Sequence, residues 1–407
     1  MKDFEIKNLI KPLLSSMRDF NDYHVKKQLE SFLNNNSQIK MCYPFGEFNG
    51  SESFFDKVYK PLLNALPDLE RRDMILLAGT TTEGRNWVGS MGNYMGTFIK
   101  PFLNIPPNGH LVHMRYHEFF CLEENKIVEM QIIWDIPELM MLSNSWPMSP
   151  QLGACLCTPS PMTSDGLDDH GDGKKSIALI KNMLSDMCLH PENPDPKVMN
   201  LEKYWHPQFN WYGPAGIGTC RGVSGFRNWH QIPFLRGMPN RTVDKNSDVN
   251  SNWIAETHWI GSGPYVCETG WPNMKMNLTN DGWLGIAPVN KEIMLKSLDF
   301  WRLESGLIRE NWVLVDLLDV FNQVGVNVFE RLNEFNKAKN LGSILILEDM
   351  DSLFINRNNT EDNKSNVSFS MNVENKDISK NDLLKKRQAL PRIDCNNFPH
   401  GQIYKKI

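Results

Sequence analysis

The chain has 407 residues and a formal net charge of −5, with 43 Lys and Arg against 48 Asp and Glu. This balance, without any basic run interleaved with aromatic residues, argues against nucleic acid as the main partner. No apolar stretch reaches the length of a membrane span, and the N-terminus lacks the apolar run of a signal peptide. The eight cysteines are scattered apart from Cys155 and Cys157, which is typical of free thiols in a reducing compartment. We therefore expect a cytoplasmic protein of two or three domains.

Residues 1–144 predict a first domain that begins with helices and ends with a sheet. Apolar residues recur with helical spacing over residues 1–35, and Ser51 opens another helix that ends at Pro67. Between these helices a short strand and a loop are expected, at residues 39–43 and 45–50. A four-stranded meander follows, at residues 72–77, 87–98, 110–122 and 127–134. A short helix begins directly after Asp135.

Residues 145–173 interrupt this pattern because Pro, Ser, Gly and Asp dominate them, which predicts a linker. Helical spacing resumes at Ser176, and a second series of helices and strands predicts a second domain over residues 174–332. Residues 333–407 are predicted to be a polar, largely disordered tail. Within it, residues 355–385 have too little apolar surface to offset the entropy cost of ordering.

Two fixed offsets relate the second series to the first. The larger offset aligns a run of identical residues that begins with Leu103 on Leu284 and ends with Asp135 on Asp316. The smaller offset aligns a run that begins with Gly50 on Gly222 and ends with Ser90 on Ser262. We interpret the agreement as a tandem duplication with an insertion in residues 263–282 of the second copy, which makes Asp135 the counterpart of Asp316.

Asp316 lies where a predicted hairpin passes into a helix. The strands cover residues 293–303 and 308–315, and the apolar spacing then changes from two to about 3.6. Counting back in twos from Asp316 gives Leu314 and Trp312, so its face of the strand is apolar. A carboxylate on an apolar face loses hydration, which raises its pKa toward values useful for proton transfer. Asp316 can alternatively be a helix N-cap, for which Asp is among the preferred residues.

Asp299 occupies a similar position on the partner strand, where it shares a face with Trp301. The same loss of hydration makes it a candidate to tune the first carboxylate or to orient a substrate. A structural ion pair with Arg302 or Arg309 is the alternative interpretation.

Three segments, GWLGIAP, LDFWRLESGLIRENWVLVD and DVFNQVGV, resemble the SnoaL-like polyketide cyclase (ester cyclase) family. The resemblance is strongest over residues 176–330 and weaker over residues 20–143. It implies an α+β fold of two tandem nuclear transport factor 2-like cone domains, each a curved, mostly antiparallel sheet with helices. It also implies cofactor-free ring closure by intramolecular aldol addition, or an isomerisation, of a small hydrophobic carbonyl compound. The general acid/base aspartate of the characterised cyclases matches Asp316 in the second domain and Asp135 in the first.

An enolate-forming site also needs donors for the developing oxyanion. We consider His230 and His258 as donors or second acids beside Asp316 and Asp299, although either histidine can be structural. Further candidates for substrate contact are Trp229, Trp301, Trp312 and Asn311, with Asp135 and Glu118 in the first domain. The first domain is expected to be the weaker site or a scaffold, because Phe120 and Gln131 replace both hairpin tryptophans.

Histidines at 110, 113 and 117 invite a metal interpretation. In a strand, His113 and His117 share a face but stand about 13 Å apart, too far for one ion. We therefore expect no metal, and we interpret Cys155 and Cys157 as two free thiols.

Three functional classes stay open: a cyclase-like or isomerase-like enzyme, a non-catalytic small-molecule-binding protein, and a protein-interaction module. A deep apolar cavity that reaches Asp316 favours the first two, and a flat exposed sheet face favours the third. We expect the two cones to pack through their sheets as an internal pseudo-dimer, with a further homo-oligomer left open.

Overall fold

The computed structural model describes residues 3–190, 193, 195–240 and 256–339. Most of the predicted tail, including residues 355–385, lies outside the described residues. Helix α11 (Val328–Ala338) crosses the predicted end of the second domain at residue 332, so ordered structure extends past that boundary. No helix in the described part of the chain is long and apolar enough to cross a membrane.

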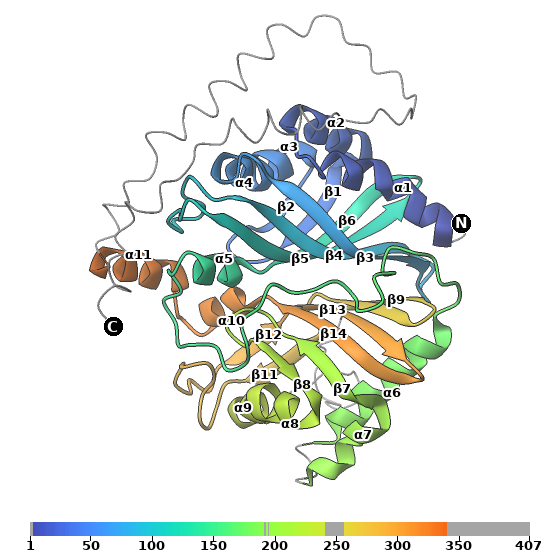
Figure 1. Cartoon of the computed structure of the whole chain (residues 1–407), viewed down its shortest axis with the longest axis vertical. Helices are drawn as coiled ribbons and strands as arrows, with labels where there is room; N and C mark the ends of the chain where they lie inside the picture. The colour runs from blue at the N-terminus through green and yellow to red at the C-terminus, as the bar shows by residue number, and fades with distance from the viewer. Residues whose placement is uncertain (1–2, 191–192, 194, 241–255, 340–407) are drawn as a thin grey trace, which may run out of the picture. The chain divides into compact units, whose positions relative to one another are not determined.

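The first half consists of helices and one mixed sheet (Figure 1). In chain order its elements are α1 (Asp3–Ser16), α2 (Asp22–Phe32), β1 (Leu33–Met41), β2 (Gly46–Asn49), α3 (Ser51–Phe54), η1 (Phe55–Tyr59), α4 (Lys60–Ala65), β3 (Glu70–Thr80), β4 (Asn86–Thr97), β5 (Leu111–Glu123), β6 (Lys126–Trp134) and α5 (Ile136–Leu142). The strand order is β2-β1-β6-β5-β4-β3, with β1 parallel to β6 and all other neighbours antiparallel.

The second half repeats this arrangement. In chain order its elements are α6 (Lys174–Cys188), η2 (Pro196–Met199), α7 (Leu201–Tyr204), β7 (Trp205–Tyr212), β8 (Thr219–Arg221), α8 (Gly222–Phe226), η3 (Arg227–Gln231), α9 (Ile232–Gly237), β9 (Thr257–Ser262), β10 (Tyr265–Gly270), β11 (Met274–Asn277), β12 (Glu292–Leu295), β13 (Ser297–Glu304), β14 (Leu307–Val315), α10 (Leu317–Gln323) and α11. Its sheet has the order β8-β7-β14-β13-β10-β9, with β7 parallel to β14. The predicted α+β class, with two mixed six-stranded sheets, is confirmed.

The register of the last hairpin agrees between the halves at the larger offset, which aligns Asp135 with Asp316. Glu118 lies opposite Ile132, and Asp299 lies opposite Val313. The irregularity in each hairpin also falls at equivalent places, after Cys121 in the first half and after Arg302 in the second. Both halves carry a π-helical segment, η1 and η3, at positions that the smaller offset aligns.

The register also corrects part of the sequence alignment. Val88 of β4 lies opposite Phe120, and Val266 of β10 lies opposite Trp301, the residue equivalent to Phe120. Strands β4 and β10 therefore correspond, at an offset that lies between the larger and the smaller offset found in the sequence. Trp87 therefore corresponds to Tyr265, and the match of Trp87 with Trp259 at the smaller offset places residues of different strands together. The extra residues precede β9 and do not fall simply within residues 263–282.

Local chemistry explains the hairpin and its helix. Ser305 and Gly306 both have positive φ, 52° and 77°, which suits the tight turn between β13 and β14. Asp316 is the N-cap of α10, and its side chain accepts a hydrogen bond from the backbone N–H of Asp319 at 3.3 Å. The predicted strand over residues 293–303 is interrupted at Lys296, because β12 pairs with β11 in a separate two-stranded sheet. Residues 45–50, predicted as a loop, contain β2.

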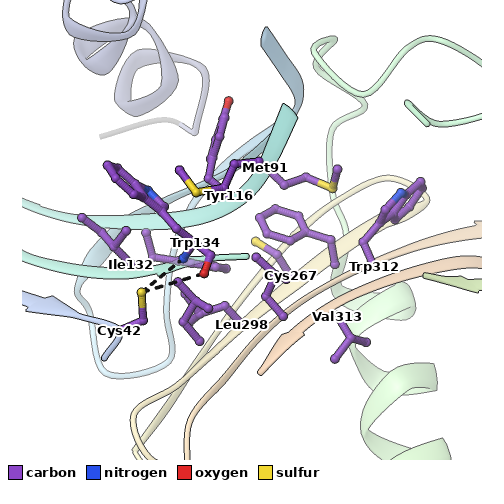
Figure 2. Close-up of a cluster of buried hydrophobic side chains, with 14 of the residues drawn as sticks. Cys42, Met91, Tyr116, Ile132, Trp134, Cys267, Leu298, Trp312 and Val313 are labelled. Carbon is purple, nitrogen blue, oxygen red and sulfur yellow. Dashed lines mark hydrogen bonds between the residues drawn. The ribbon is translucent and has the colours of Figure 1, made fainter. Parts of the chain in front are cut away.

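The two sheets contact one another through one face each. Phe119 of β5 lies 5.3 Å from Phe300 of β13 between ring centroids, and the His117 ring lies 5.0 Å from the same phenylalanine. Figure 2 shows Trp312 and Val313, neighbours on β14, pointing to opposite sides of the second sheet. We call the side that meets the first sheet the facing side, and the opposite side, which meets helices of its own half, the inner face.

Candidate functional site

The inner face of the second sheet carries two carboxyl groups side by side. Glu268 of β10 lies directly opposite Asp299 of β13 in the antiparallel ladder, so both side chains point to the same face. Burial is the main cause that raises the pKa of Asp299 to about 7, while a hydrogen bond of 2.6 Å from the Ser297 hydroxyl acts in the opposite direction. Burial and the nearby Asp299 raise the pKa of Glu268 well above its usual range. Keeping one of the two groups protonated avoids two adjacent negative charges.

Aromatic side chains surround this pair of carboxyls. Trp301 follows Asp299 on the same face of β13, and its ring is stacked with Trp259 of β9 at 6.0 Å. The Lys181 ammonium of α6 lies 5.1 Å from the centre of the Trp259 ring. Trp301 is fully buried, and its indole Nε1 has no hydrogen-bond partner among the described residues. A buried donor of this kind is suited to a polar atom of a ligand.

The row continues across the sheet toward β7. Asn311 of β14 lies between two tryptophans, opposite Trp301 of β13 on one side and Trp211 of β7 on the other. The ring of His230, from segment η3, is stacked on Trp211 with centroids 4.0 Å apart. Asn311 donates to the backbone carbonyl of Phe300 at 2.9 Å, which fixes the orientation of its amide. The structure therefore brings four of the predicted residues to one face: Asp299, Trp301, Asn311 and His230.

Asp316 does not join this group. Its carboxylate accepts hydrogen bonds from the backbone N–H groups of Asp319 and, in the first half of the chain, Tyr43, which lies 3.0 Å from Oδ2. The Lys296 ammonium lies 3.8 Å from Oδ2. Burial raises the pKa of Asp316 to about 7, although Lys296 opposes the rise. Asp316 and Asp299 therefore do not share one site, because Asp316 reaches the first half from the facing side.

Asp135 makes the equivalent contact in the other direction. Its Oδ2 accepts from the backbone N–H of Ala215 in the second half at 2.9 Å and lies 3.4 Å from Arg115. Tyr43 and Ala215 are themselves equivalent, because the smaller offset that aligns them also relates β1 to β7. Burial and the nearby Glu138 raise the pKa of Asp135 to about 6. The two aspartates that the sequence resemblance singled out thus each bind the other half of the chain.

Three other candidates also lie away from the inner face. Trp312 is on the facing side and donates to the backbone carbonyl of Pro159 at 3.2 Å. His258 is also on the facing side, stacked on Trp87 of the first half at 4.7 Å. Trp229 is 52% exposed. These positions follow from strand alternation and helix rotation, which the sequence spacing did not resolve for these residues.

Glu118 occupies the position in the first half that Asp299 has in the second, but its surroundings differ. Its Oε2 lies 2.5 Å from Arg71, and both side chains are fully buried. Tyr94 and Trp134 each donate to its Oε1 at 3.0 Å. The inner face of the first sheet therefore carries a polar network whose groups are hydrogen-bonded to one another. The alternative ion pair of Asp299 with Arg302 or Arg309 is not formed, since Arg302 pairs with Glu310 at 2.6 Å and Arg309 binds the Gln208 carbonyl.

Sequence reasoning missed Glu268, Trp259 and Trp211 as members of this face. Glu268 corresponds by register to Ser90 of the first half, so the second carboxyl is particular to the second half. The signal that could have found it is the pairing of β10 with β13, which the alignment at the smaller offset concealed. Three cavities formed by described residues are lined by neither Asp299 nor Asp316. The described residues contain no group of three metal-ligating side chains arranged to hold an ion.

No protein-family model matches the chain, and no curated protein matches it. Solved structures do match: AclR from Streptomyces galilaeus has 16% identity and a TM-score of 0.31, covering 37% of this chain and 92% of its own. A SnoaL-like polyketide cyclase from Agrobacterium tumefaciens has 20% identity and a TM-score of 0.27, covering 35% of this chain and 98% of its own. A nuclear transport factor 2-like protein from Burkholderia thailandensis has 12% identity and a TM-score of 0.27, covering 35% and 97%. Each corresponds to about a third of this chain, and at these values the likeness says nothing about what the chain does.

Proposed function

We propose that the inner face of the second sheet is an acid/base site for a small hydrophobic carbonyl compound. Asp299 is the carboxyl that transfers the proton, and Glu268 is its partner. The observation that carries the proposal is the pair of adjacent carboxyls, with Glu268 buried and Asp299 half-buried, both with raised pKa, among three tryptophans. A carboxyl whose pKa lies near neutrality can both accept and return a proton at neutral pH.

The chemistry that fits is proton abstraction next to a carbonyl. Ionised Asp299 takes a proton from the carbon, while protonated Glu268 keeps the second negative charge from forming beside it. The indole N–H of Trp301 is a donor for the enolate oxygen, and the stacked tryptophans supply apolar contact for the substrate. An enolate formed in this way can be reprotonated elsewhere, giving an isomer, or can add to a second carbonyl, giving a ring.

We therefore assign the general base to Asp299 and not to Asp316, the residue that the sequence resemblance implied. Asp316 uses its oxygens for a helix cap and a contact between the halves, whereas Ser297 is the hydrogen-bond donor to Asp299 in the described part of the chain. A carboxylate that already accepts backbone hydrogen bonds on both oxygens is less available to a substrate.

Hydrogen–deuterium exchange of a ketone tests the reaction without knowledge of the natural substrate. 2-Tetralone, an aromatic ketone with acidic α-protons, is incubated with the protein in deuterated buffer, and its α-protons are followed by NMR. We expect exchange above the buffer rate, and a fall on the order of 10²–10⁴ in Asp299→Asn. Asp316→Asn is the matched control and keeps the wild-type rate. Loss of exchange in Asp316→Asn, with Asp299→Asn unaffected, would return the role to Asp316.

A further inference from the structure

A second group of reactive side chains lies in a cavity of about 190 Å³, bounded by β5, α5, the linker and the loop after β7. Among its lining residues are His113, Arg115, Asp135, Glu138, Gln151 and Cys157. Its volume exceeds the roughly 150 Å³ of a cavity that holds benzene, so a small organic molecule fits. Asp299 and Glu268 do not line it, which separates it from the inner face.

A thiol, an imidazole and a carboxylate meet here. His113 Nε2 lies 3.3 Å from Glu138 Oε1, and the other oxygen of Glu138 accepts from the backbone N–H of Arg115 at 2.8 Å. Burial lowers the pKa of His113, but hydrogen bonds to Cys157 and Glu138 outweigh burial and raise this pKa to about 10. Glu138, which is itself fixed, therefore orients the imidazole that interacts with the thiol. A nucleophile beside a base that a third group orients is the arrangement of covalent catalysis.

One nitrogen donor on the cavity wall is unused. Arg115 Nε is buried and has no hydrogen-bond partner among the described residues. The other guanidinium nitrogens of Arg115 are occupied, since they donate to the carbonyls of Tyr212 and Gly213 at 2.9 and 2.7 Å. Arg115 is only 1% exposed, so its guanidinium is held in place. A fixed N–H donor at a cavity suits the oxyanion of an acyl-transfer intermediate.

The thiol and imidazole are not part of what the two halves share. At the larger offset His113 and Glu138 correspond to Met294 and Asp319, so the second half lacks the imidazole. Cys157 comes from the linker, which joins the halves and occurs once. The cluster is therefore an addition to the repeated framework.

We propose that this cavity is a second reactive site, at which Cys157 takes the acyl group of a small ester. With the thiol proton on His113, the sulfur forms a bond to the carbonyl carbon. The bond from that carbon to the leaving oxygen breaks, and His113 gives its proton to the leaving alcohol. The acyl group remains as a thioester on Cys157 until water releases it as a carboxylic acid and restores the thiol. The net reaction is hydrolysis of the ester.

Acetylation by p-nitrophenyl acetate tests this site in the full-length protein. We expect a burst of one p-nitrophenolate per chain, and tandem mass spectrometry that places the acetyl group on Cys157. Cys155 is the internal control, because both thiols are exposed, lie two residues apart and line the same cavity, whereas the hydrogen bond to His113 involves Cys157. Cys157→Ser should abolish the burst, Cys155→Ser should keep it, and His113→Gln should slow it on the order of 10-fold or more.

Three results would each overturn the proposal. The first is acetylation divided evenly between Cys155 and Cys157 in the wild-type protein. The second is a burst in His113→Gln as fast as in the wild type, and the third is no burst at all. The comparison of the two thiols needs no variant, so it holds even where a substitution disturbs folding.

Discussion

Two residues at equivalent positions, Glu118 and Asp299, show how the neighbour of a carboxyl group determines its charge state. Glu118 faces a buried arginine at 2.5 Å and two further donors, so its charge is compensated. Asp299 faces Glu268 and receives one hydrogen bond from Ser297. Charge compensation stabilises the first half, whereas its lack in the second half keeps a titratable proton near neutral pH. Of these two carboxyl groups, the candidate for function is Asp299, which stabilises the fold less than Glu118 does.

This difference predicts how stability depends on pH. Asp299 has a pKa near 3.8 when exposed and about 7 when folded, so the folded chain binds its proton more tightly. Its contribution to the free energy of unfolding is therefore present below about pH 4 and is lost as the pH rises to about 7. Asp299→Asn removes this loss, and urea unfolding at pH 8 should show a variant more stable than the wild type. Ser297→Ala removes the hydrogen bond that lowers this pKa, so the loss should extend to higher pH and become larger. An unchanged pH profile in both variants would contradict the assignment.

At the scale of single residues, the sequence predicted correctly which side chains share a sheet face where strand alternation alone determines this. Asp299 and Trp301 share a face as counting in twos requires. Counting in twos also placed Asp316 with Trp312, but it did not show which side of the sheet meets the other half. Glu268 required the pairing of two strands, and the contact of Cys157 with His113 required the path of the linker. Neither depends on local spacing, so neither was accessible from one sequence.

Among the elements, periodicity located the long segments and missed the short ones. Helix α5 (Ile136–Leu142) begins directly after Asp135 as predicted, because Asp135 and a proline mark its start. Strands β2 and β8, at Gly46–Asn49 and Thr219–Arg221, are too short to show alternation. The registers of the two hairpins agree at the larger offset, as a tandem duplication requires. The sequence alignment of the two halves is wrong around β9. Relative to the first half, the second half has extra residues before β9 and a shorter turn after it.

The two equivalent helices α5 and α10 allow a cap and a cross-half contact to be separated. Asp316 caps α10 and also binds Tyr43, whereas Asp135 binds Ala215 but makes no side-chain cap hydrogen bond. Asp316→Ala should therefore cost about 0.5–2 kcal/mol more in the free energy of unfolding than Asp135→Ala, which is the value of an N-cap. Urea denaturation of both variants measures the difference. Equal losses would mean that the cap contributes nothing and that the cross-half contact accounts for the whole effect.

Over the whole described chain, the two halves differ in how the carboxyl groups on their inner faces are compensated. The first half has a satisfied inner face, the second carries unpaired carboxyls on its inner face, and their other faces contact one another. Contacts between the halves come from charged groups as well as rings. Asp316 accepts a hydrogen bond from Tyr43 of the first half, and Asp135 accepts one from Ala215 of the second half. We infer that the first half stabilises a second half whose own site is costly to fold. With a scaffold of this kind, the second half can keep carboxyls whose charge is not compensated.

Arg115 is where this dependence can be tested. From β5 its guanidinium donates to three backbone carbonyls of the second half, those of Tyr212, Gly213 and Val313. Its counterpart Lys296 forms ion pairs only within its own half among the described residues, at 3.0 Å with Asp319. Arg115→Met leaves buried carbonyls without a donor, so it should cost about 3–5 kcal/mol, whereas Lys296→Met should cost less. We expect calorimetry to show one unfolding transition for the wild type and for Lys296→Met, and two separated transitions for Arg115→Met, with the second half melting first. A single transition in Arg115→Met, at the wild-type temperature, would show that the halves do not depend on this contact.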